Sequence, residues 1–108
     1  MDIEETLSER GKNYGLFDDQ ARITQNIKRA MEDSKNWKGL SNDKREALEM
    51  VAHKVGRILN GNPEFHDSWH DIIGYVKLVA DTLLPKKLPE ELVFDYPTVY
   101  PTEVIDDE

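Results

Sequence analysis

Apolar residues recur at helical spacing in three separate segments of the chain. Separations of three, four or seven residues place side chains on one face of an α-helix. The first segment runs from about Asp18 to Ser34, and Asp18 or Asp19 is available to cap its start. Its apolar stripe consists of Ile23, Ile27, Ala30 and Met31. The spacing therefore predicts a long helix over about 18–34.

Two further helices are predicted downstream. One begins at Ser41 or Asn42 and stops at Asn60-Gly61-Asn62-Pro63, where a left-handed Gly61 and a following proline form a strong stop signal. The other begins near Asp67 or Ser68 and ends at about Leu84, before Pro85. The apolar stripes are Leu48, Val51, Ala52, Val55, Ile58 and Leu59 in the former and Trp69, Ile72, Ile73, Val76, Val79, Ala80 and Leu83 in the latter. The short connection predicts an antiparallel helical hairpin.

These segments predict an all-α fold, a three-helix bundle with the antiparallel hairpin at its core. Residues 10–15, Arg-Gly-Lys-Asn-Tyr-Gly, hold two glycines and predict a structured loop after a short helical turn. Pro89, Pro97 and Pro101 disfavour a helix near the carboxyl end. We therefore expect a helical domain over 1–87 and an extended acidic arm over 88–108.

Composition narrows the class of protein. The 108 residues suffice for one small domain, and the absence of cysteine excludes disulfides and thiol-based zinc sites. No apolar run approaches the roughly 20 residues that a membrane-spanning helix needs. The first ten residues are acidic and polar, unlike a signal peptide. A cytoplasmic protein with no membrane partner is expected.

The net charge of −8 is unevenly distributed. Residues 88–108 contain seven acidic and no basic side chains, whereas residues 1–87 contain 15 acidic and 14 basic ones. The predicted helical domain is therefore almost neutral. Because a nucleic-acid groove needs an excess of clustered Lys and Arg, direct binding of nucleic acid is not expected.

Opposite charges meet in the predicted hairpin. Lys54 and Arg57 lie near the end of its first helix, and Asp67 and Asp71 lie near the start of its second. Antiparallel packing makes these pairs neighbours. Two interpretations stay open: a salt-bridge cluster that fixes the register of the hairpin, or a binding site.

Two other groups of residues are candidates for chemistry. Glu46 and Glu49, with Asp71 from the next helix, are oxygen donors of the kind that hold Mg²⁺, although nearby Lys54 and Arg57 would compete with a cation. Arg10 and Lys12 in the predicted glycine loop could hold a phosphate. The alternative is a loop that packs the tyrosine at position 14 against the bundle. The chain contains no G-x-S-x-G or kinase-like motif.

Three motifs carry a family resemblance. They are Glu9-Arg10-Gly11-Lys12-x-Tyr14-Gly15-x-Phe17, Lys54-x-x-Arg57-Ile58-x-x-Gly61-Asn62 and Asp67-Ser68-Trp69-x-Asp71-Ile72-x-Gly74-Tyr75. Over residues 8–81 the chain resembles a family of small phage-encoded domains of unknown function. More distantly, it is similar to MazG-like all-α nucleotide pyrophosphatases. Glu46-x-x-Glu49 fits the first metal motif of those enzymes, but Asp67-x-x-x-Asp71 departs from the spacing of the second.

The resemblance leaves two hypotheses about function. The first is a phage protein that binds a nucleotide or another phosphate-bearing ligand, with or without turnover. Its expected ligand contacts are Arg10, Lys12, Lys54, Arg57, Asp67, Asp71 and Tyr75. The second is a non-enzymatic inhibitor of a host defence protein that acts through the acidic arm over 88–108. In either case the wide apolar stripes predict a homo-oligomer, a dimer above all.

Overall fold

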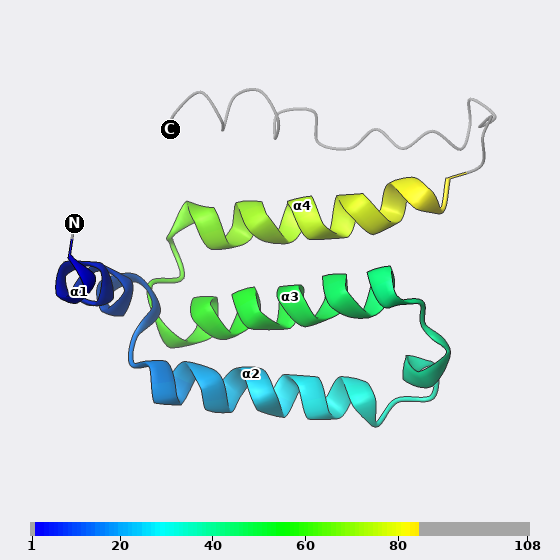
Figure 1. Ribbon diagram of the computed structural model, residues 1–108, viewed down its shortest axis with the longest axis horizontal. Coiled ribbons are helices and arrows are strands. Elements are labelled where there is room, and N and C mark those ends of the chain that lie inside the picture. The colour runs from blue at the N-terminus through cyan, green and yellow to red at the C-terminus, as the bar shows by residue number, and fades with distance from the viewer. Residues whose placement is uncertain (1, 85–108) are drawn as a thin grey trace.

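The computed structural model describes residues 2–84, and within this range it contains helices and no strand (Figure 1). The helices are α1 (Ile3–Tyr14), α2 (Phe17–Glu32), the short 3-10 helix η1 (Trp37–Gly39), α3 (Asn42–Asn60) and α4 (His66–Thr82). The predicted all-α fold is confirmed. The arm predicted over 88–108 lies outside the described residues.

The three predicted long helices correspond to α2, α3 and α4. Ser41 is the N-cap of α3, as expected, but its hydroxyl is bonded to the carboxylate of Asp43 and lowers the pKa of that carboxyl. The cap predicted for α4 near Asp67 or Ser68 is two or three residues late, because Phe65 is the N-cap. Asp67 consequently lies in the first turn, where its negative charge interacts favourably with the helix dipole.

The loop predicted over residues 10–15 is wrong, because α1 continues through Gly11 to Tyr14. The side chain of Asp2 caps this helix by accepting a hydrogen bond of 2.8 Å from the backbone N–H of Glu5. Acidic residues in the first turn and Lys12 in the last also suit the helix dipole. Only Gly15, with a φ of 80°, leaves the helical conformation.

Helices α2, α3 and α4 lie side by side in one layer, with α3 in the middle, and α1 crosses one end of that layer (Figure 1). The α3–α4 pair is the antiparallel hairpin that the sequence predicts. Helix α2 runs antiparallel to α3 on its other side. The middle helix therefore contacts both neighbours. The side chains that project out of the layer, toward the viewer of Figure 1 or away from the viewer, form its two faces.

A glycine allows α2 and α3 to approach closely. Gln20 and Thr24 of α2 are buried, and the Gln20 Nε2 donates to the Thr24 Oγ1 over 2.8 Å. A Cβ atom on Gly56 of α3 would overlap the Thr24 hydroxyl. At this crossing the buried polar groups of Gln20 and Thr24 are hydrogen-bonded to each other, and the missing side chain of Gly56 leaves room for them.

The apolar core of this layer is small. Within residues 2–84 the buried apolar residues are Ala47, Ala52 and Ile58, and no large side chain is completely buried. Many large apolar side chains on the same helices are exposed, among them Leu59 and Trp69. A single layer of three helices has no second layer on which to bury them.

Candidate functional site

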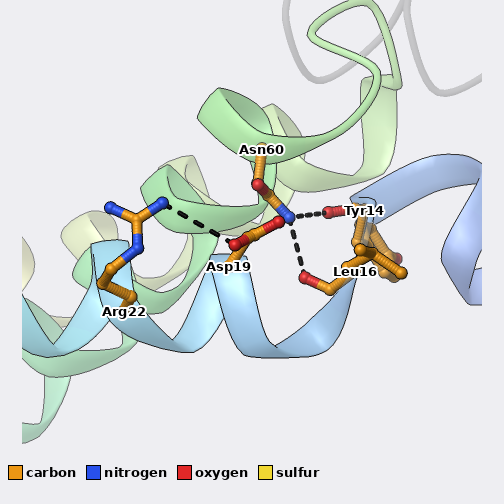
Figure 2. Close-up of polar contacts among 5 residues, drawn as sticks. All are labelled: Tyr14, Leu16, Asp19, Arg22 and Asn60. Atoms are coloured by element: carbon orange, nitrogen blue, oxygen red, sulfur yellow. Dashed lines mark hydrogen bonds and ion pairs between the residues drawn. The ribbon is translucent and has the colours of Figure 1, made fainter.

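The junction between α1 and α2 is held by Asn60, at the end of α3 (Figure 2). Its side-chain Nδ2 donates hydrogen bonds to the carbonyl oxygens of Tyr14 (2.8 Å) and Leu16 (3.0 Å). In the following turn, the backbone N–H of Asn62 donates to the carbonyl oxygen of Asn13 over 2.7 Å. Together these bonds fix the position of Tyr14 relative to α3.

Two glycines make this junction possible. A Cβ atom on Gly61 would overlap the backbone of Asn13 and Tyr14, and one on Gly15 would overlap Asn60. The left-handed conformation predicted for Gly61 is wrong, since its φ is −126°. Gly61 is needed for close approach of the backbones, and Gly15 is the residue with a positive φ.

Tyr14 carries an arginine on its ring. The guanidinium carbon of Arg57 lies 4.0 Å from the centre of the Tyr14 ring, a distance at which the cation–π attraction is substantial. The Tyr14 and Phe65 rings pack in a T-shaped, edge-to-face arrangement, with 5.8 Å between their centres. The Arg57 Nε is buried and forms no hydrogen bond to any residue between 2 and 84. Arg57 is therefore held by stacking on Tyr14, and no side chain within residues 2–84 forms an ion pair with its guanidinium.

One of the predicted charge contacts across the hairpin is present. The Lys54 Nζ lies 3.0 Å from a carboxylate oxygen of Asp71, and the Lys54 side chain is only 12% exposed. Arg57 stacks on Tyr14 instead of extending this pair. Asp67 is exposed one helical turn before Asp71, and Tyr75 is half-buried one turn after it. The polar side of α4 thus lines one edge of the site.

Three cations act on His53, a half-buried residue of α3. Its pKa is lowered mainly by burial, and then by the positive charges of Arg57, Lys54 and Lys28. Lys28 comes from α2, and the other three residues come from α3. The four side chains, Lys28, His53, Lys54 and Arg57, are called here the cationic cluster. It concentrates positive charge on a chain whose net charge is −8.

The other basic residues predicted to bind a ligand lie on α1. Arg10 is exposed one helical turn before Tyr14, so both side chains leave the same face of α1. Lys12 pairs weakly with Glu9 at 3.9 Å on the surface. The predicted phosphate-cradling loop is wrong in its backbone, because the N–H groups of a helix interior are already bonded to the preceding turn. Arg10 remains a candidate through its side chain alone.

The structure does not bring the predicted magnesium ligands together. No group of three or more His, Asp or Glu residues within 2–84 is arranged to hold a metal ion. Asp71 pairs with Lys54, and Glu49 and Glu46 are five and eight residues from Lys54 along α3. With a rise of about 1.5 Å per residue, those separations are roughly 7.5 and 12 Å along the helix axis.

Sequence reasoning found the charges of the hairpin and missed three neighbours. The spacing of His53 and Arg57, four residues apart, places both on one face of α3 and was an available signal. No sequence signal identified Tyr14 as a neighbour of Arg57, or Lys28 as a neighbour of His53. Their positions depend on how α1 and α2 pack against α3.

No family model, curated protein or solved structure matches this chain. Among residues 2–84, no helix has the length and apolar character needed to cross a membrane. The cationic cluster and its aromatic neighbours are therefore the features from which a function can be inferred.

Proposed function

We propose that the protein binds a small phosphate-bearing ligand, a nucleotide, at the cationic cluster. The observation that carries this proposal is the arrangement of Arg57, which is stacked on Tyr14 while its buried Nε lacks a hydrogen-bond partner among residues 2–84. A guanidinium fixed in this way is suited to charge-assisted hydrogen bonds with phosphate oxygens.

The neighbouring residues supply further charge. The positive charges of Lys28, Lys54 and Arg57 each act on His53 and lower its pKa, so the three cations surround one imidazole. An anion placed among them would reduce their mutual repulsion. The pair between Lys54 and Asp71 orients the lysine and leaves its other N–H donors available.

Aromatic rings beside the cluster fit the remainder of a nucleotide. Tyr14 and Phe65 lie edge to face next to Arg57, and Tyr75 lies on the α4 side. A nucleobase stacks on aromatic and guanidinium planes irrespective of its sequence identity. The proposed role is binding, and the resemblance to phage-encoded domains and MazG-like proteins supports a ligand from nucleotide metabolism.

Thermal unfolding with added ligands tests this proposal. We expect one or more of the common (d)NTPs, cyclic dinucleotides or inorganic pyrophosphate, at 1 mM, to raise the Tm by several degrees, because a ligand that binds only the folded state stabilises it. Lys28→Ala should abolish this Tm shift. Arg57→Lys keeps the charge but loses the planar donor group, and it should lower the apparent ligand affinity at least tenfold.

Arg22→Ala is the matched control for loss of one positive charge. Arg22 forms an exposed ion pair with Asp19 at 3.8 Å on α2 (Figure 2), and it is not among the cations that lower the pKa of His53. This variant should keep the ligand-induced shift. Equal loss in Arg22→Ala and Lys28→Ala would mean that net charge alone attracts the ligand, and no shift with any of these ligands would refute the proposal.

A further inference from the structure

The side of the layer opposite the cationic cluster is apolar. On α3, Val55 is two residues from both His53 and Arg57, which places it about 200° around the helix from each. Leu48 and Leu59, seven residues before and four after Val55, continue its stripe. Leu48 is 42% and Leu59 is 66% exposed.

Helix α4 contributes a second stripe to the same side. Trp69, Ile73, Val76 and Leu83 follow one another at separations of four, three and seven residues. Their exposed fractions are 51%, 36%, 49% and 62%. An apolar groove of about 290 Å³ between α3 and α4 is lined by Leu48 from one stripe and by Val76 and Leu83 from the other. The two stripes therefore lie on one side of the layer.

These residues are called here the apolar face: Leu48, Val55, Leu59, Trp69, Ile73, Val76 and Leu83. Leaving out half-buried Val55, their exposed fractions amount to about three fully exposed large side chains, on the order of 300–600 Å² of apolar surface. The largest apolar patch on a monomeric protein is typically about 300–600 Å² and is often functional, so a face of this size marks an interaction surface. Each partner contributes roughly 800 Å² to a stable interface, of which a little over half is apolar, and the area of this face lies in the range of that apolar part.

We propose that a second copy of this chain covers the apolar face, so that two three-helix layers stack on each other. The buried apolar residues within 2–84 are two alanines and one isoleucine, and a second layer would supply the missing half of a core. A twofold dimer buries the same surface on both copies, which suits a face that is apolar throughout.

Charge favours a second copy over the carboxyl-terminal residues as the occupant. Residues 88–108 carry seven acidic side chains and no basic one, whereas among residues 2–84 Lys44 is the one charged residue that lines the groove. An acidic segment would find little to neutralise it there. A second apolar face brings no such charge.

Sedimentation equilibrium of the full chain at 10–100 μM tests the proposal. We expect a mass of twice 12.5 kDa. Val76→Glu should weaken dimerisation at least about 100-fold, since it places an unpaired charge in the interface. Leu78→Glu is the matched control, because Leu78 is 69% exposed on the other side of α4 and its substitution should leave the dimer intact. Helical content by circular dichroism verifies that each variant folds.

A spin-label experiment keeps the test decisive if Val76→Glu fails to fold. The chain has no cysteine, so Val76→Cys and Leu78→Cys each give a single labelling site. We expect a nitroxide at position 76 to be immobilised in the dimer and one at position 78 to be mobile. A monomeric mass at 100 μM overturns the proposal, and an immobilised label at 76 in such a monomer would identify residues 85–108 as the cover. A dimer with a mobile label at 76 also overturns it.

Discussion

At the scale of single residues, the charge of His53 should make stability depend on pH. An unfolded histidine titrates near pH 6.5, and burial with three nearby cations lowers the pKa of His53 in the folded protein. As the pH falls below 6.5, the unfolded chain therefore gains a proton before the folded protein does, and stability decreases. Well above pH 6.5, from about one pH unit higher, both states are neutral at this residue and the contribution is constant.

The expected result is a pH-dependent loss of unfolding free energy between pH 6.5 and 5 that His53→Gln removes. One proton taken up by the unfolded chain corresponds to at most about 1.4 kcal/mol per pH unit, and the partial exposure of His53 keeps the slope below this limit. Urea unfolding at pH 7.5, 6.5, 5.5 and 5.0 measures it. His70→Gln, at an exposed position, is the control. An unchanged slope in His53→Gln would contradict the prediction.

At the scale of secondary-structure elements, the packing of α2 on α3 depends on Gly56. Gly56→Ala should lower the free energy of unfolding by about 1–3 kcal/mol, because its methyl group would overlap the Thr24 hydroxyl at the crossing. Gly74→Ala is the matched control, since Gly74 is an exposed helical glycine with no atom within 4 Å of an added Cβ. It should raise stability by about 0.5–1 kcal/mol. Urea unfolding of both variants gives the comparison, and equal effects would disprove the role of the crossing.

The sequence predicted the elements better than their junctions. The apolar stripes and the stop at Asn60 located α3 closely, because both signals are local. Helix α1 was underestimated: Gly11 was interpreted as a loop signal, although capping by Asp2 and bonding to the neighbouring turns keep it helical. The position of Gly61 against Asn13 depends on tertiary packing, which no local pattern contains.

The candidate site shows the same division. Lys54 and Asp71 were predicted as neighbours because antiparallel helices bring the end of one to the start of the next, and their Nζ and carboxylate lie 3.0 Å apart. Arg57 was expected to contact the aspartates of α4 as well, but its guanidinium stacks on the ring of Tyr14 from α1 instead. The sequence-based grouping of Glu46 and Glu49 with Asp71 did not take account of the helical rise along α3, which places both glutamates away from the Lys54–Asp71 pair.

At the scale of the whole molecule, the layer has two chemically different sides. The cationic cluster lies on one side, and the apolar face lies on the other, with the close crossing at Gly56 between α2 and α3. This separation means that ligand binding and self-association use different side chains. The two proposed properties should therefore respond independently to substitution.

Val76→Glu and Lys28→Ala test that independence in opposite directions. The new carboxylate at position 76 lies across the layer from the cluster, where salt at 0.15 M screens charges beyond about 8 Å, so ligand affinity should change less than twofold while the dimer dissociates. Lys28→Ala should do the reverse, losing the ligand-induced Tm shift and keeping the mass of a dimer. Titration of the best ligand against both variants, with sedimentation of the same samples, measures the two properties together. Loss of ligand affinity in the Val76→Glu monomer would show that the site is completed by the second copy, which would contradict the separation of the two sides.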